Sequence, residues 1–374
     1  MRTMSPVLLS GRSVWDQSFF PRDEFEERIR KVRTLAAEQG IDGLLLFGNR
    51  TDYANLVYLT HFLPRSGWAI AILPLTGDSD STLFFSGGGA RDAPFMRTIT
   101  WIEDVRYLNP VDGIGTILDE KYPRMKRLGI IGAHAMPVQI HEGLFKSLSG
   151  HDLAEVDHLL REIRSRLRPR ERSAIVQAWS LVQLAREKAS ECFLRGESTR
   201  TALVQAELTA RKQGAHDFRI SINSKDGRWL WPLDNSVQTL SHRLVAYMAV
   251  EFQGYWADGT VTLPLPDSDV GKKAKRALDS MIDAARPGTT AGAVADCALK
   301  ELGPELGSPA TEIGLGNGLG LSLEEPPVVR IGAEDQLIEG NILSLRVYIP
   351  DGENSVFFSD LITIGKEGGE LFSM

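Results

Sequence analysis

The stretch that most constrains the fold is residues 246–258, which read Ala-Tyr-Met-Ala-Val-Glu-Phe-Gln-Gly-Tyr-Trp-Ala-Asp. Two apolar runs, rich in aromatic and β-branched residues, flank a polar bend that contains Gly254, and this pattern predicts a β-hairpin. The second run ends on Asp258, a carboxylate in an aromatic setting. Because burying an unpaired carboxylate is costly, we expect Asp258 to be either a paired structural acid or a working group.

Length and charge limit the class of protein. A chain of 374 residues suggests two or three domains. Its net charge of -7 argues against nucleic acid as the main partner, since phosphate binding needs a basic face. No apolar leader and no run of roughly 18 apolar residues is present, so we expect no membrane association. Cys192 and Cys297 lie far apart in the sequence, and we expect reduced thiols in a cytoplasmic protein.

The first part of the chain alternates helical and strand-like segments. A helical pattern covers residues 21–39, and short apolar runs at 43–47, 68–73 and 128–131 are typical of buried strands. This alternation predicts an α/β domain. We also predict a helix over residues 152–167, ended by Arg168-Pro169-Arg170, and place the domain boundary there, between residues 1–168 and 169–374.

The second part repeats one order of elements. Helices are predicted over residues 171–194 and 200–213, followed by a strand at 218–222 and by the hairpin. Helices at 271–285 and 290–302 follow, the latter ended by Gly303 and Pro304, and then strands at 341–349 and 356–364. Helix, turn, helix and strands therefore occur twice, which predicts two pseudo-equivalent halves with a pocket between them.

Several local motifs carry a resemblance to a known family. They are Gly-Tyr-Trp-Ala-Asp at 254–258, Gly-Asn-Gly-Leu-Gly-Leu at 316–321 with Glu-Pro-Pro at 325–327, the strand at 340–345, and Leu-Val-Tyr-Leu-Thr at 56–60. On these motifs the chain resembles the pita-bread superfamily of creatinase, Xaa-Pro aminopeptidase and prolidase. The resemblance implies an α/β N-terminal domain and an α+β C-terminal pita-bread domain. The latter has pseudo-two-fold symmetry and a curved antiparallel sheet covered by helices.

The resemblance also marks five positions where peptidases of this superfamily hold two metal ions with two Asp, one His and two Glu. Here those positions fall on Tyr247, Asp258, Asn317, Arg346 and Ser359. A two-metal centre needs several anionic or imidazole ligands, whereas Arg346 carries a permanent positive charge. From the sequence we therefore expect no metal, no other cofactor and no active metallopeptidase.

The replaced positions suggest a pocket for a small polar or zwitterionic molecule. Arg346 offers a fork that fits a carboxylate, from a substrate or from Asp258. The catalytic candidates are Asp258 or Glu324 as base, Tyr247 as acid, and Arg346. The substrate-binding candidates are Asn317, Ser359, Glu325, Trp229, Trp231 and Tyr255. In creatinase-like homodimers the partner's N-terminal domain closes the site, and by this resemblance His61 and Arg65 are further candidates.

Two hypotheses of different class follow. The first is a metal-independent enzyme resembling creatinase that hydrolyses, eliminates or cyclises at a C–N bond of a small amino-acid-like substrate. It predicts a closed polar pocket around Asp258, Arg346 and Asn317. The second is an inactive pseudo-peptidase that binds a ligand or a protein, and it predicts that Arg346 fills the former metal cavity. For Asp258 itself, a structural ion pair with Arg346 is the alternative to a catalytic role.

Overall fold

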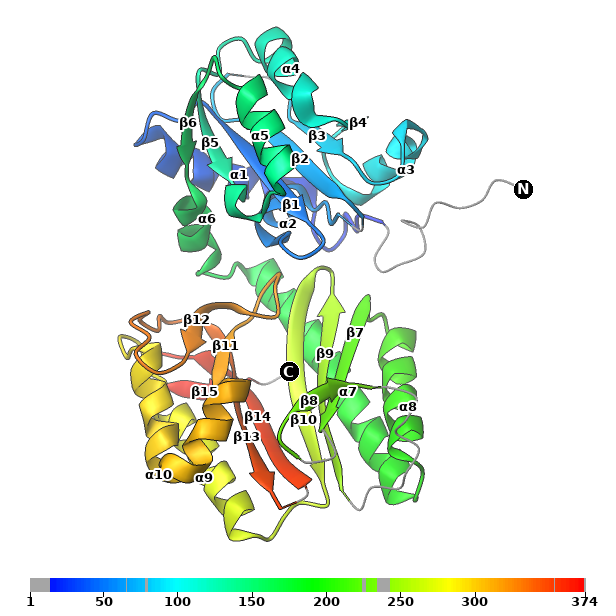
Figure 1. The fold of residues 1–374 in the computed structure, drawn as a ribbon, viewed down its shortest axis with the longest axis vertical. Coiled ribbons are helices and arrows are strands. Elements are labelled where there is room, and N and C mark those ends of the chain that lie inside the picture. Colours follow the sequence, from blue (N-terminus) through cyan, green and yellow to red (C-terminus); the bar gives the residue numbers. More distant parts are fainter. Residues whose placement is uncertain are drawn as a thin grey trace, which may run out of the picture. The chain divides into compact units, whose positions relative to one another are not determined.

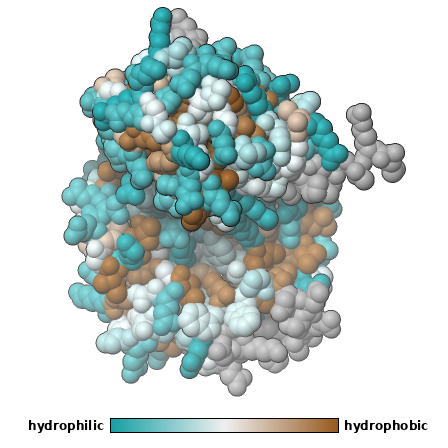
Figure 2. Space-filling model, turned by 45° about the horizontal axis from the view of Figure 1, so that its top comes forward, coloured by the Kyte–Doolittle hydropathy of each residue, from teal (hydrophilic) through white to brown (hydrophobic). Residues whose placement is uncertain are grey.

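The computed structural model describes residues 14–64, 66–77, 80–223, 227–233, 243–352 and 354–372. The chain divides into two compact units, Met1–Ser165 and Arg166–Met374, which are treated separately below. None of the helices in these ranges has the length and apolar character needed to cross a membrane. On the face seen in Figure 2, hydrophobic side chains are interspersed with hydrophilic ones.

The first unit is built on a six-stranded sheet in the order β4-β3-β2-β1-β5-β6. The central pairs β1–β2 and β2–β3 are antiparallel, and the outer pairs β3–β4, β1–β5 and β5–β6 are parallel. The strands are β1 (Gly43–Asn49), β2 (Trp68–Pro74), β3 (Thr82–Phe85), β4 (Asp104–Tyr107), β5 (Arg127–Ile131) and β6 (Asp152–Glu155). β1 and β2 are almost entirely buried, as their continuous apolar runs predict.

Helices accompany this sheet, and one of them corrects the sequence-based expectation. They are α1 (Arg22–Ala37), α2 (Ala54–Thr60), α3 (Ala93–Met96), α4 (Ile114–Lys121), α5 (Val138–Ser147) and α6 (Asp157–Arg164). The helix predicted over residues 152–167 is wrong in its first turn. β6 occupies Asp152–Glu155 and pairs in parallel with β5, and α6 begins only at Asp157. The free edge of a distant strand supplies the hydrogen bonds, which local periodicity does not reveal.

The second unit contains two α-helical pairs and two antiparallel sheets, as Figure 1 shows. The helices are α7 (Pro169–Leu194), α8 (Thr199–Lys212), α9 (Asp269–Ala284) and α10 (Ala291–Ile313). The first sheet, in the order β10-β9-β7-β8, comprises β7 (Asp217–Asn223), β8 (Leu230–Pro232), β9 (Leu244–Phe252) and β10 (Tyr255–Leu263). The second, in the order β12-β11-β13-β14-β15, comprises β11 (Gly316–Gly318), β12 (Glu325–Val329), β13 (Ile342–Asp351), β14 (Asn354–Ile364) and β15 (Gly369–Leu371).

β10 and β14 join the two sheets. The hydroxyls of Thr260 and Thr262 on β10 both donate to the carbonyl oxygen of Phe357 on β14, at 3.1 and 2.9 Å. In Figure 1, α7 and α8 lie beside the first sheet, and α9 and α10 beside the second. Each half therefore has the order of two helices followed by strands that the sequence predicts.

The hairpin predicted at residues 246–258 is confirmed as β9–β10. Tyr255 pairs with Phe252 across the bend, and both bend residues have positive φ, 52° at Gln253 and 90° at Gly254. Two such residues are the signature of a two-residue hairpin turn whose twist matches that of the strands. The register of this turn decides which side chains of β10 share the face of Asp258.

The helix predicted over residues 290–302 continues further than expected. Gly303 has φ 73° and ψ 174°, which interrupts α10, but helical backbone resumes and runs to Ile313. Gly303 and Pro304 therefore bend the path of the chain without ending it. The reason is that Pro304 can start a helical segment, since its missing N–H is not needed in a first turn.

Candidate functional site

Asp258 and Tyr247 form the centre of a polar cluster on one face of the first sheet. Tyr247 on β9 pairs with Thr260 on β10, and Thr260 and Asp258 lie two residues apart on the same side of the strand. The phenol of Tyr247 therefore reaches diagonally and donates to Oδ2 of Asp258 at 2.8 Å. Asp258 is only 1% exposed, so this hydrogen bond is buried at the carboxylate end.

Arg346 and Asn317 join this cluster from the second sheet. β11 and β13 pair Asn317 with Ser344, which places Asn317 diagonal to Arg346. Nη2 of Arg346 donates to Oδ1 of Asn317 at 2.6 Å, and Nη1 lies 3.5 Å from Oδ2 of Asp258. The ion pair between Asp258 and Arg346 that the sequence suggested is thus confirmed. The amide nitrogen of Asn317 donates to the carbonyls of Gly318 and Leu323, which holds the amide in this orientation.

One oxygen of this cluster has no partner among the described residues. Tyr247 and Arg346 both approach Oδ2 of Asp258, whereas Oδ1 is buried and accepts no hydrogen bond. A buried carboxylate oxygen without a donor is costly. Its position therefore marks a place where an N–H, an ammonium group or a water molecule would be stabilised.

Burial and the charges of the cluster together shift the pKa of Tyr247. Burial, followed by the negative charge of Asp258, raises the pKa of the Tyr247 phenol well above its ordinary value, against the opposing effect of Arg346. The phenol therefore stays protonated at neutral pH and acts as a hydrogen-bond donor.

Ser359 lies opposite Arg346 in the β13–β14 register. Its hydroxyl donates to the Thr260 hydroxyl at 3.1 Å, so it links β14 to β10 next to the ion pair. The structure thus brings together all five positions that the resemblance marked, at one point where the two sheets meet.

The other candidate residues lie elsewhere. Tyr255 faces the opposite side of β10 and donates to Oε1 of Glu171 at 2.7 Å. Glu325, the first residue of β12, accepts from the backbone N–H of Ser322 in the preceding loop, and Glu324 is exposed. Trp229 and Trp231 are 47% and 55% exposed. Their roles as substrate-binding residues stay predictions.

His61 and Arg65 belong to the first unit. His61 is buried, and its Nδ1 lies 3.2 Å from the carbonyl oxygen of Ile99. Arg65 lies outside the described residues. The predicted contribution of both from a partner subunit stays untested.

The sequence-based reasoning missed Arg219 and Ser221 on β7. Ser221 pairs with Tyr247, and Arg219 lies above the ring of Trp256, with its guanidinium carbon 4.4 Å from the ring centroid. The positive charge of Arg219 acts on Tyr247 in the same direction as that of Arg346. The signal was present in the sequence, because Phe218, Ile220 and Ile222 alternate with polar residues as in a half-buried strand.

Comparisons with known proteins show the family to which the chain belongs. Residues 28–166 match the Creatinase/Prolidase N-terminal domain, and residues 173–366 match metallopeptidase family M24. The second match covers more than half of the chain, so the chain belongs to metallopeptidase family M24. The expected fold, an α/β domain followed by an α+β pita-bread domain, is confirmed.

Individual relatives match over nearly the whole chain. An Xaa-Pro dipeptidase from Pyrococcus horikoshii is 24% identical over 361 residues, which cover 93% of this chain and 97% of the relative. The crystal structure of the prolidase from Pyrococcus horikoshii has a TM-score of 0.73 at 21% identity, covering 92% of this chain and 97% of that one. An X-Pro aminopeptidase from Thermotoga maritima has a TM-score of 0.77 at 17% identity, with the same coverage.

These findings correct the functional expectation from the sequence. The predicted metal-independent, creatinase-like enzyme is contradicted by the match to metallopeptidase family M24 and by relatives that are Xaa-Pro dipeptidases. The expectation that the chain is not an active metallopeptidase is contradicted by the same findings, and the inactive pseudo-peptidase is not carried further. The expectation was wrong because it rested on five substituted side chains, whereas the similarity to peptidases extends through both domains.

Proposed function

We propose that this protein acts on short peptides, with Xaa-Pro dipeptides as its substrate class. One observation carries the proposal: the 24% identity with an Xaa-Pro dipeptidase extends over 361 residues and through both domains. A similarity of this length includes the elements that shape a substrate site as well as the core.

The polar cluster supports peptide binding. Oδ1 of Asp258 is a buried acceptor suited to the ammonium group or an N–H of a peptide. Arg219, whose side chain is about half exposed, offers a guanidinium that suits a peptide carboxylate. In this arrangement Tyr247 and Arg346 hold the Asp258 carboxylate in place, and the peptide lies between an acceptor and a donor.

We further propose that this chain is divergent at the metal positions of its family. Metal ions of such sites would supply an activated water and polarise the scissile carbonyl. Among the five positions only Asp258 carries a carboxylate, and no group of three or more His, Cys, Asp or Glu in the described ranges could hold a metal ion. Arg346 places a cation between Asp258 and Asn317, where a dication would be repelled. The described residues therefore do not fit the two-metal centre.

The substrate proposal is tested with the full chain and matched dipeptides. Ala-Pro and Leu-Pro are compared with Pro-Ala and Ala-Ala, in protein as purified and after addition of Mn²⁺, Co²⁺ or Zn²⁺. Released amino acids are measured by mass spectrometry and binding by calorimetry. We expect the Xaa-Pro dipeptides to be bound and cleaved in preference to the others. If none of them is bound or cleaved under any of these conditions, the proposal is wrong.

Variants connect this result to the cluster. Asp258→Asn keeps the shape of the side chain and removes its charge, so we expect affinity or kcat/KM for Ala-Pro to fall by about tenfold or more. Asp283→Asn, an exposed position on α9, is the matched control and should leave both unchanged. Equal values for the two variants would place the peptide elsewhere.

The proposal that the metal positions have diverged is tested separately, by metal analysis after dialysis. We expect far less bound metal in the natural chain than in a variant that combines Tyr247→Asp, Asn317→His, Arg346→Glu and Ser359→Glu. Two equivalents of metal in the natural chain would refute the proposed divergence at the metal positions. The proposed substrate class would not be affected.

A further inference from the structure

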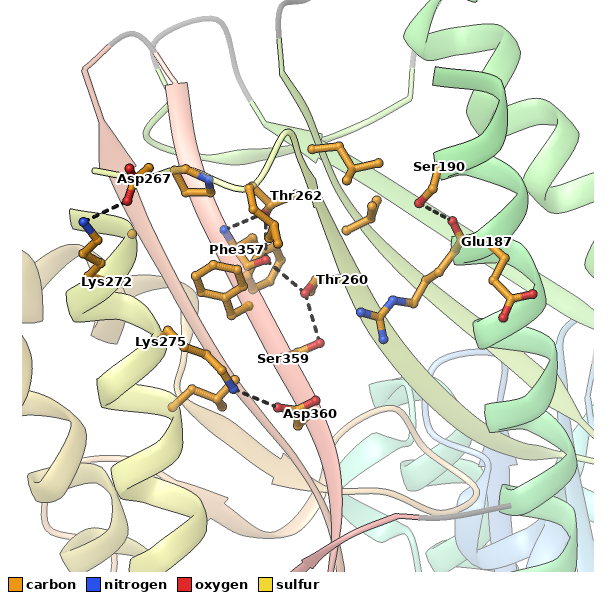
Figure 3. Close-up of a pocket in the computed structure, with 18 of the residues that line it drawn as sticks. Glu187, Ser190, Thr260, Thr262, Asp267, Lys272, Lys275, Phe357, Ser359 and Asp360 are labelled. Atoms are coloured by element: carbon orange, nitrogen blue, oxygen red, sulfur yellow. Dashed lines mark hydrogen bonds and ion pairs between the residues drawn. The ribbon is translucent and has the colours of Figure 1, made fainter. Parts of the chain in front are cut away.

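A cavity of about 870 Å³ lies in the second unit, on the side of the sheets that α7 and α9 cover. Figure 3 shows it between these two helices, with Thr260, Ser359 and Phe357 of β10 and β14 at its base. Its volume is in the range of small-molecule sites in proteins. The cavity lies wholly within one unit, so its shape does not depend on how the two units are arranged.

This cavity borders the cluster around Asp258 at Thr260 and Ser359 but is not lined by its ion pair. Tyr247, Asp258, Asn317 and Arg346 do not line it, and of the five marked positions only Ser359 does. Gly259 lets α7 approach β10 closely, because a Cβ at this position would lie 2.8 Å from Val182 and 3.4 Å from Cδ of Arg186. Gly259 therefore faces α7, whereas its neighbour Asp258 points to the opposite face.

The wall of the cavity holds Arg186, which forms no close ion pair with the described residues, although the carboxylate of Asp360 in the same lining acts on it electrostatically. Nη1 of Arg186 on α7 donates to Oε1 of Gln183 at 3.2 Å, and no carboxylate of the described residues lies within 4.0 Å of its guanidinium. Burial lowers the pKa of Arg186, but a guanidinium remains protonated in proteins. A partly buried positive charge thus faces the cavity with only a neutral amide bound to it.

Both lysines of the lining have acidic partners, whereas Glu187, an exposed carboxylate of α7 in the same lining, forms no ion pair with the described residues. Lys272 pairs with Asp267 at 2.8 Å, and Lys275 pairs with Asp279 at 2.7 Å. Lys275 also lies 3.8 Å from Asp360, as the dashed line in Figure 3 marks. Arg186 is therefore the cation best placed to receive an anion from solution.

The rest of the lining is mainly apolar. Its apolar wall includes Val261, Leu263, Leu265, Pro266, Leu278 and Phe358, beside the hydroxyls of Ser190, Thr260, Thr262 and Ser359. Such a wall favours a ligand with a hydrophobic body. One guanidinium fits one carboxylate in a two-pronged contact, whereas a doubly charged phosphate would call for a second free cation.

We propose that this cavity binds a small organic carboxylate with an apolar body, with the carboxylate on Arg186 and the body against the wall of Val261, Leu278 and Phe358. The site is independent of the proposed peptide substrate. The ligand would lie between α7 and α9, where β10 and β14 meet.

Calorimetry with 3-phenylpropionate and its uncharged analogue 3-phenylpropionamide tests the site in the full-length protein. We expect one molecule of the acid to bind, and the amide to bind about tenfold more weakly or worse. Arg186→Met should weaken binding of the acid to the level of the amide. Arg211→Met, an exposed arginine on α8 paired with Glu207, should leave it unchanged.

A second variant locates the ligand. Ser190→Trp fills the cavity from α7 while keeping Arg186, and it should abolish binding of both compounds. The proposal is overturned if acid and amide bind equally, if Arg186→Met or Ser190→Trp binds like the natural protein, or if no saturable binding occurs up to about 10 mM. Thermal unfolding of each variant without ligand shows whether it is folded.

Discussion

At the scale of single residues, the contact between Arg346 and Asp258 joins two strands that lie far apart in the sequence. Asp258 is almost fully buried, and Arg346 is the one cation that contacts it among the described residues. When one partner of a buried pair is removed, the other is left without compensation, which costs more than the pair itself contributes. The pair therefore makes both residues sensitive to substitution.

We expect Arg346→Met to lower the free energy of unfolding by about 2 kcal/mol, because it leaves Asp258 with the Tyr247 phenol alone. In the Asp258→Asn background the same substitution should cost clearly less, since no buried charge remains. Urea denaturation of the two single variants and the double variant measures this coupling. Additive costs would mean that the 3.5 Å contact contributes nothing to stability.

Asp104 in the first unit gives a prediction about pH. Burial alone would raise the pKa of this carboxyl, but hydrogen bonds from Arg106, Lys121 and Thr82 outweigh it and hold the pKa at about 2. Since the pKa is lower in the folded than in the unfolded chain, the stabilisation is present above about pH 4 and lost as the pH falls through about 2.

We therefore expect Asp104→Asn to be less stable than the natural protein by about 1 kcal/mol at pH 7, after allowance for solvent screening. The difference should shrink between about pH 4 and pH 2. Chemical denaturation of both proteins across this range measures it. A constant difference from pH 7 to pH 2 would contradict the assigned cause.

At the scale of elements, two features depend on backbone geometry more than on composition. The β9–β10 turn could be predicted because Gln253 and Gly254 lie between two apolar runs. The path of α10 could not, because the same Gly-Pro pair that ends many helices here redirects one. A Gly-Pro pair in the sequence predicts that a helix is interrupted. Whether helical backbone resumes after it depends on how the following segment packs.

Gly303→Ala tests the bend in α10. The backbone at φ 73° and ψ 174° is a conformation that essentially only glycine adopts, so alanine should destabilise the protein by about 1–3 kcal/mol. Glu305→Ala, an exposed position two residues further, should change stability by less than about 0.5 kcal/mol. Thermal unfolding compares the two. An equal, small effect would show that α10 is continuous in solution.

At the scale of the whole molecule, the two compact units divide between Ser165 and Arg166 and have separate hydrophobic cores. A domain with its own core can unfold separately. We expect calorimetry of the full chain to show two transitions, and residues 166–374 expressed alone to reproduce one of them. A single transition, with an unfolded fragment, would indicate that the units depend on each other.

The homodimer in which the partner's N-terminal domain lies near the site stays a prediction. Sedimentation of the natural chain should give twice the monomer mass. A monomer at all concentrations would remove the predicted contribution of His61 and Arg65 from a partner subunit.

The sequence by itself determined the order of elements, the hairpin that ends at Asp258, the two-domain fold and the five positions that meet in the second unit. The order of elements and the hairpin follow from periodicity and turn chemistry, which act over a few residues. The fold and the five positions were implied by the family resemblance that the local motifs carry. The pairing of Arg346 with Asp258 was foreseen because a buried carboxylate needs a cation.

Only the tertiary structure decided the rest. It placed Tyr255 on the opposite face of the hairpin, brought Arg219 and Ser221 beside Tyr247, made a strand of residues 152–155, and left Oδ1 of Asp258 without a donor from the described residues. It also opened a cavity around Arg186 between helices whose facing residues lie far apart in the chain. All of these features have the same physical reason. Strand register and the packing of distant elements decide which side chains meet, and a local sequence pattern predicts neither of them.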